Sequence, residues 1–193
     1  MSKKEKNVIV GLFIVMFLLG LVSSIFIGYN VIQNADSKLN VSSAEDLTTL
    51  VDKIYEGVTM QMPNVATQEI DITDADMVQY ITGLENGNDL EYAVVSEPMM
   101  SSQAYSLVLV KVKNGVNATD VAKTMKDNID TRKWICVSAE KVYATTSGDV
   151  VCLVMANADT AKAVYDSFKT LAGSVGQEYE RSEEEPELPP EMF

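Results

Sequence analysis

Apolar residues recur at helical spacing in four segments of the chain, and four other short segments are rich in β-branched, aromatic and other apolar residues, which is typical of strands. The predicted helices are residues 44–57, 74–83, 118–129 and 159–172, and the predicted strands are residues 90–96, 104–113, 141–146 and 149–156. A short extended piece is expected at 67–72. The strands form two hairpin-like pairs with a helix between them, which predicts an α+β fold: an antiparallel sheet of about four strands with helices packed on one face.

Residues that favour helix ends support these assignments. Ser43, Thr73 and Asn117 each stand three residues before an acidic side chain, which is the spacing of a capping box. Asp159 is expected to open the last helix. Glycines follow three of the helices and are expected to end them.

A longer apolar run precedes this domain. Residues 8–27 carry no charge and no proline, and as one helix they would span the roughly 30 Å hydrocarbon core of a bilayer. Lys3, Lys4 and Lys6 precede the run, so the positive-inside rule places the N-terminus in the cytoplasm and the rest of the chain outside. A cleaved signal peptide is the alternative, although the run is longer than its usual apolar core.

These patterns predict a membrane-anchored organisation of the chain. Its expected parts are a cytoplasmic tip at 1–7, a transmembrane helix at 8–27, a polar stalk at 28–42, an extracytoplasmic α+β domain at 43–173 and a disordered acidic tail at 174–193.

Charge and composition restrict the function further. The formal net charge is −13, and since the N-terminal tip holds three Lys and one Glu, the remainder carries −15. Such a surface repels nucleic acid, which is excluded as a partner. No histidine is present, which removes the usual serine or cysteine triad and the commonest transition-metal ligand. Chemistry based on carboxylates stays open.

The two cysteines, Cys136 and Cys152, are interpreted as small buried apolar residues. A turn at Ser147-Gly148 would pair Thr146 with Asp149 and set Tyr143 opposite Cys152. Cys136 would then lie seven residues further along, so a disulfide would require the chain before residue 141 to fold back. Whether the two cysteines pair is left open.

Two loops are candidates for an interaction surface. Met99 and Met100 follow a proline after the first strong strand, and Arg132, Lys133 and Trp134 form a basic and aromatic spot on an acidic domain. Either loop could contact a partner. The competing interpretation is that Trp134 packs at the edge of the core.

Two sets of side chains could form metal sites, but each has a simpler interpretation, and no cofactor or metal is expected. The carboxylates of Asp71, Asp74 and Asp76 could bind a hard cation, but their spacing matches no EF-hand loop and suits helix capping. Thioethers beside two prolines could bind Cu(I), but they equally suit loose packing under loops. These thioethers belong to Met60, Met62, Met99 and Met100.

The stretch from the first strong strand to the closing helix resembles an uncharacterised extracytoplasmic domain of unknown function that is common in Firmicutes. The resemblance covers about residues 44–172 and rests on Pro98 with Met99, the strand end Lys111-Val-Lys113, Trp134 and Gly148. It implies a Gram-positive envelope location, and lipoprotein or single-pass anchored relatives. It implies no activity, cofactor or catalytic residue.

The sequence therefore predicts a membrane-anchored extracytoplasmic module that acts without catalysis, by contact with an envelope protein or the cell wall. The alternative is a carboxylate-dependent envelope enzyme or a cation-binding protein.

Overall fold

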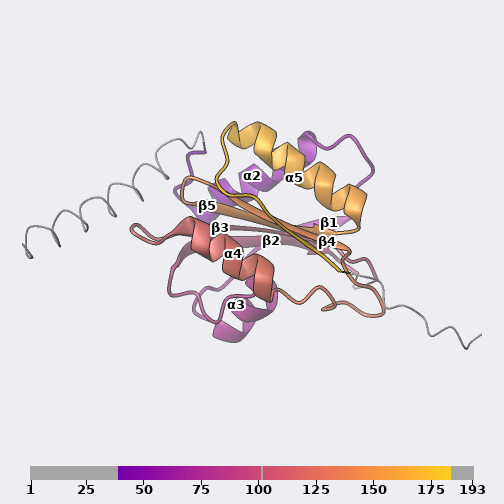
Figure 1. Ribbon diagram of the computed structural model, residues 1–193, viewed down its shortest axis with the longest axis horizontal. Helices are drawn as coiled ribbons and strands as arrows, with labels where there is room; N and C mark the ends of the chain where they lie inside the picture. The colour runs from indigo at the N-terminus through magenta and orange to yellow at the C-terminus, as the bar shows by residue number, and fades with distance from the viewer. Residues whose placement is uncertain (1–38, 101, 184–193) are drawn as a thin grey trace, which may run out of the picture. The chain divides into compact units, whose positions relative to one another are not determined.

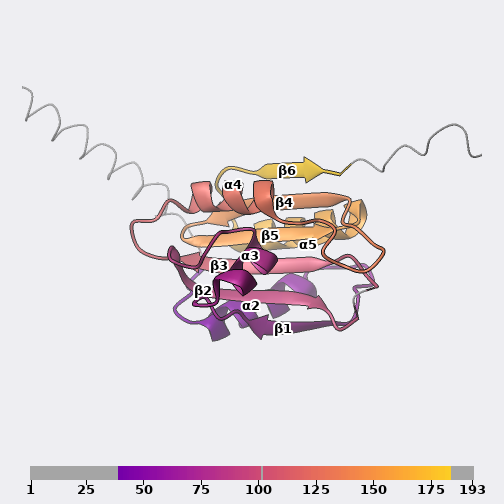
Figure 2. The same ribbon diagram turned by 90° about the horizontal axis from the view of Figure 1, so that it is seen from below.

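The computed structural model describes residues 39–100 and 102–183. Within them the chain forms an α+β domain built on one six-stranded antiparallel sheet, whose strand order is β1-β2-β3-β5-β4-β6 (Figure 2). In chain order the elements are α2 (Ala44–Glu56), β1 (Val65–Glu69), α3 (Ala75–Thr82), β2 (Leu90–Pro98), β3 (Ser106–Val112), α4 (Ala118–Asn128), β4 (Lys141–Ser147), β5 (Val150–Ala156), α5 (Ala158–Ala172) and β6 (Tyr179–Ser182).

Helices cover both faces of this sheet, so the expectation of helices on one face is wrong. Helices α2 and α5 lie on one face, and α3 and α4 lie on the other (Figure 1). The reason is visible in the central strand β3. Leu107 and Leu109 of β3 enter the core under α2 and α5, while Val108 and Val110 enter the opposite core. A strand with two apolar faces needs a helical layer on each side.

The sheet has two more strands than the four expected. Strand β1 takes the place of the expected extended piece at 67–72, two residues earlier. Strand β6 lies inside the segment 174–193 that was expected to be a disordered tail, and it pairs antiparallel with β4. Its sequence, YERS, carries two charges and too little apolar pattern to predict a strand. Residues 184–193 lie outside the described part.

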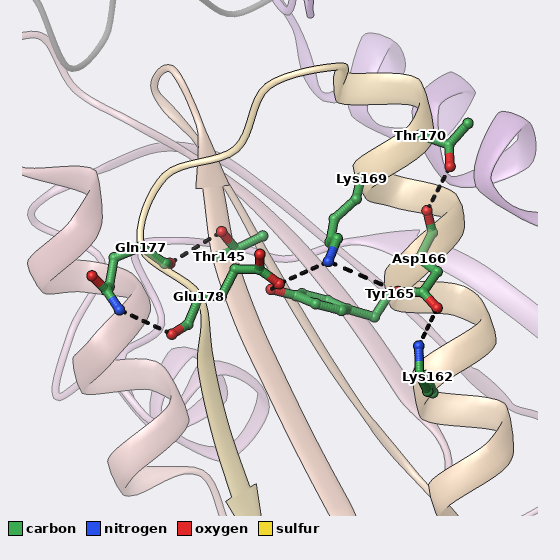
Figure 3. Close-up of polar contacts among 8 residues, drawn as sticks. All are labelled: Thr145, Lys162, Tyr165, Asp166, Lys169, Thr170, Gln177 and Glu178. Atoms are coloured by element: carbon green, nitrogen blue, oxygen red, sulfur yellow. Dashed lines mark hydrogen bonds and ion pairs between the residues drawn. The ribbon is translucent and has the colours of Figure 1, made fainter.

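Contacts with α5 and β4 hold the segment that leads into β6 (Figure 3). The Tyr165 hydroxyl donates to Glu178 Oε2 at 3.0 Å, and Lys169 Nζ lies 2.8 Å from the same oxygen. The Thr145 hydroxyl donates to the Gln177 carbonyl at 3.1 Å. These contacts explain how a strand with little apolar surface is added to the sheet.

Four predicted helices are confirmed, with two corrections at their starts. The Ser43 side chain accepts from the Asp46 amide, and that of Asn117 accepts from the Thr119 amide, as N-caps do. The N-cap of α3 is Asp74 rather than Thr73. The N-cap of α5 is Asn157, so α5 begins at Ala158, one residue before the expected Asp159.

The β4–β5 hairpin differs from its expected register by two residues. Ser147 pairs with Val150, so the turn residues are Gly148 and Asp149, and Thr145 rather than Tyr143 lies opposite Cys152. Gly148 has φ +63°, which suits the tight turn. Both cysteines are free.

The predicted tip at 1–7, the transmembrane helix at 8–27 and the stalk up to residue 38 lie outside the described residues. Among the helices that are described, none combines the length and the apolar character needed to cross a bilayer.

Candidate interaction site

One end of the sheet gathers the loops that carry the candidate residues. Pro98 ends β2 opposite the start of β1, Ser106 begins β3 opposite Met155, and Lys141 begins β4 opposite Ala156. The connections 57–64, 99–105 and 129–140 therefore meet at this end, together with the start of α5. We call this region the loop end; it lies on the right in Figure 2.

Large apolar side chains are exposed at the loop end. Met99 is 75 %, Met100 72 % and Ile135 69 % exposed, and Met60 is 38 % exposed. Isolated exposed apolar residues are ordinary, but several on adjoining loops are typical of contact surfaces. Met99 and Met100 therefore lie where a partner could reach them.

Lys133 does not form the basic surface spot that the sequence suggested. Its side chain is 1 % exposed, and its Nζ lies 2.6 Å from Glu97 Oε1 at the end of β2. The same Nζ lies 5.1 Å from the centroid of the Tyr80 ring and 5.5 Å from that of the Trp134 ring. The ammonium is thus enclosed by one carboxylate and two aromatic faces, which stabilise a cation.

The electrostatics of this pair follow from its burial. Desolvation lowers the pKa of Lys133, and the nearby Glu97 carboxylate opposes that shift. Within the described residues, neither Lys133 Nζ nor Glu97 Oε1 has a further hydrogen-bond partner. The Tyr80 hydroxyl donates to the Lys133 carbonyl at 3.3 Å, so α3 also holds this loop. The pair fixes the 129–140 loop to β2 rather than offering a free charge to a ligand.

The neighbouring side chains take different positions. Trp134 is half-buried and packs against the core under α3 and α4, as the competing interpretation held. Arg132 is exposed. Cys136 is also exposed, with φ +60°, so its interpretation as a buried residue is wrong, whereas Cys152 is fully buried. Burial raises the pKa of the Cys152 thiol, which makes it unreactive.

A pocket of about 450 Å³ opens at the loop end, on the side of α5. Uncharged side chains that can form hydrogen bonds make up much of its wall: Gln61, Gln103, Tyr105, Ser138, Asn157 and Thr160. The rest of the lining is apolar or small: Met62, Pro63, Ala104, Val137 and Ala156. The lining contains no carboxylate, so the acids that the alternative function requires do not converge here.

Three of the candidate metal ligands, Asp71, Asp74 and Met62, have structural roles in this domain. Asp71 Oδ1 accepts from the amide and hydroxyl of Thr73, and the Asp74 side chain caps α3. Met62 packs partly buried against the core under α2 and α5. In the part of the chain that the structure describes, no group of three or more His, Cys, Asp or Glu side chains is arranged to hold a metal ion.

Sequence reasoning missed three residues of this site. Glu97 and Tyr80 lie 36 and 53 positions before Lys133, and nothing in their local sequence indicates that they meet it. Ile135 did carry a signal, because it is a large apolar residue next to Trp134 in a segment without periodicity.

Comparison with known proteins does not assign this chain to a family. No family model matches the chain, and the searches of curated proteins and of solved structures returned no significant match. The likeness to the Firmicutes extracytoplasmic domain family therefore stays a prediction.

Proposed function

We propose that this protein is a membrane-anchored extracytoplasmic module that binds another protein of the cell envelope, or the cell wall, through its loop end. The observation that carries the proposal is the exposure of Met99, Met100 and Ile135 on adjoining loops. The chain has a net charge of −13, so most of its surface repels an acidic partner. Uncharged apolar side chains such as these add no such repulsion.

The anchor is the second part of the proposal. It is supported by the uncharged run at 8–27, by the lysines before it and by the polar segment after it. With this anchor the domain would work close to the outer face of the membrane that holds it. Binding to a partner in the same membrane or in the adjacent wall would be favoured, because both partners are confined to a thin layer.

Photo-crosslinking tests the contact. A photoreactive amino acid at Met99 of the full chain is expected to capture a defined protein or wall fragment in the producing cells, identified by mass spectrometry. The same amino acid at Asn114, an exposed residue in the turn after β3 at the other end of the sheet, is the control. Equal capture from both positions, or none from Met99, would contradict the proposal.

Substitution of the apolar side chains sharpens this test. The triple variant Met99→Ser, Met100→Ser, Ile135→Ser is expected to lose the captured partner and to keep its fold, because all three side chains are exposed. Met77→Ser on α3, where the side chain is 41 % exposed, is the matched control and should retain capture. Flotation with vesicles, with and without residues 8–27, tests the anchor separately.

A further inference from the structure

Strand β1 forms an edge of the sheet with few of the features that usually block edge pairing. It is the first strand in the sheet order, and among residues 39–100 and 102–183 no further strand pairs with it. Its sequence is VATQE, with a single charge at its last residue and no proline. The opposite edge, β6, has four residues, two of them charged. Edge strands are normally protected by charges, prolines or shortness.

The hydrogen-bond phase of β1 shows which backbone groups face outward. The Ile70 amide donates to the Ala93 carbonyl at 2.9 Å, and the Met99 amide donates to the Asn64 carbonyl at 3.4 Å. Both pairs follow the β1–β2 register. Because bonded residues alternate along an antiparallel strand, Ala66 and Gln68 bond to β2. The N–H and C=O groups of Val65, Thr67 and Glu69 therefore point away from the sheet.

These outward groups form a self-complementary set. If two β1 strands pair antiparallel about Thr67, Thr67 faces its own copy and Val65 faces Glu69 of the other copy. Three residue pairs then exchange backbone hydrogen bonds. Glu69 lies opposite an apolar side chain, and Asp71 falls opposite Pro63. A parallel arrangement would instead set Glu69 beside Glu69 and Asp71 beside Asp71, in a chain that is already acidic.

We propose that β1 pairs with β1 of a second copy of this chain, antiparallel and with Thr67 on a two-fold axis, to form one continuous sheet across the dimer. Such an interface is isologous and closed, so it ends at two copies. It adds an interaction surface that is distinct from the loop end, and it does not depend on what the loop end binds.

Disulfide trapping tests this geometry in the full chain in nonionic detergent micelles. In a Cys136→Ser background, Thr67→Cys is expected to form a covalent dimer on mild oxidation, because paired Cα atoms about 5.5 Å apart lie within disulfide reach. Ser182→Cys is the control, since the Glu183–Glu140 hydrogen bond places the Ser182 amide on the outward side of β6. A mixture of Val65→Cys and Glu69→Cys should cross-link between the two variants more than either variant alone. Equal dimer from Thr67→Cys and Ser182→Cys, or no dimer from Thr67→Cys, would overturn the proposal.

A matched pair of proline variants provides an independent measurement. Thr67→Pro removes an outward amide and a hydroxyl that donates to Ser96, while leaving the β1–β2 ladder intact. Ser182→Pro removes an outward amide on β6 and a hydroxyl that accepts from Lys141. By sedimentation of the full chain in the same micelles, Thr67→Pro should weaken self-association at least about tenfold and Ser182→Pro about twofold or less. Equal effects of the two variants, or a wild-type chain that stays monomeric, would refute the dimer, and vesicle flotation reports on the anchor independently.

Discussion

Lys133 Nζ lies 2.6 Å from Glu97 Oε1 and joins the loop before β4 to the end of β2. The lysine side chain is 1 % exposed and the glutamate side chain 23 % exposed. Removal of one partner from such a pair leaves a buried charge uncompensated, whereas removal of both does not.

Glu97→Gln is accordingly expected to lower the free energy of unfolding by about 2 kcal/mol, less than for a fully buried pair because Glu97 is partly exposed. The double variant Glu97→Gln, Lys133→Met should recover most of this loss, because methionine can pack between Tyr80 and Trp134 without a charge. Urea unfolding of all three proteins measures the effect. A double variant as unstable as Glu97→Gln would show that the charge is not the cause.

The pH dependence of stability should reflect the same lysine. Burial lowers the pKa of Lys133 below its usual value of 10.5. Between the lowered pKa of the folded state and 10.5, Lys133 binds its proton more tightly in the unfolded chain than in the folded one. The free energy of unfolding that this group contributes therefore rises as pH rises through that window. The free energy of unfolding of the wild type, relative to that of Lys133→Met, should therefore increase as pH approaches 10.5. NMR titration of the Lys133 ammonium should also give a lower pKa in Glu97→Gln. An unchanged pKa in that variant would contradict the assigned pairing.

Arg181 connects β6 to the C-terminal end of α4. Its Nη1 donates to the carbonyls of Lys126 and Asp127 at 2.7 and 2.8 Å, and its Nη2 donates to that of Ile129 at 2.7 Å. Arg181→Met should cost about 2 kcal/mol, because these carbonyls have no intrahelical donor. Hydrogen exchange should accelerate in the last turn of α4. Glu180→Gln on the same strand breaks an exposed ion pair and should cost less than about 1 kcal/mol.

Tyr165 should control how firmly β6 is attached. Tyr165→Phe removes the hydroxyl that donates to Glu178 and keeps the ring that stacks on Tyr143 at a centroid distance of 5.0 Å. A loss of about 1 kcal/mol is expected, with faster amide exchange in β6. Thr170→Val removes a hydroxyl that bonds only within α5, to the Asp166 carbonyl, and should leave β6 exchange unchanged (Figure 3).

Two glycines separate the effect of backbone conformation from that of close packing. Gly83 has φ +76°, and a Cβ there would lie 2.6 Å from the Ile129 amide nitrogen. Gly115 has φ +87°, and no heavy atom lies within 4 Å of its Cβ position. Gly115→Ala should cost about 1 kcal/mol and Gly83→Ala about 3 kcal/mol, measured by thermal or urea unfolding. Equal losses would show that α3 can move away from α4 without cost.

Local signals in the sequence determined the helices and the central strands. Caps such as Ser43 and Asn117 act within three residues, and helical periodicity acts within four, so both can be read from a short window. The run of apolar and β-branched residues around 107–110 likewise marked β3. The same window misplaced the β4–β5 turn, because the pairing of Ser147 with Val150 depends on how the whole hairpin packs.

The candidate site was only partly accessible from the sequence. Met99 and Met100 were singled out and are exposed, but the role of Lys133 depends on Glu97 and Tyr80, which approach it only after β2, α3 and the 129–140 loop are assembled. An ion pair between residues 36 positions apart leaves no periodic signal in a single sequence.

The sequence by itself thus determined which segments become helices and core strands, since those choices depend on near neighbours and on apolar spacing. Only the tertiary structure decided that helices cover both sheet faces, that β6 joins the sheet, that Lys133 is enclosed and that no second described strand pairs with the outer edge of β1. The physical reason is that burial, ion pairing and strand order depend on segments far apart in the chain. These interactions contribute to stability only when those segments are packed together.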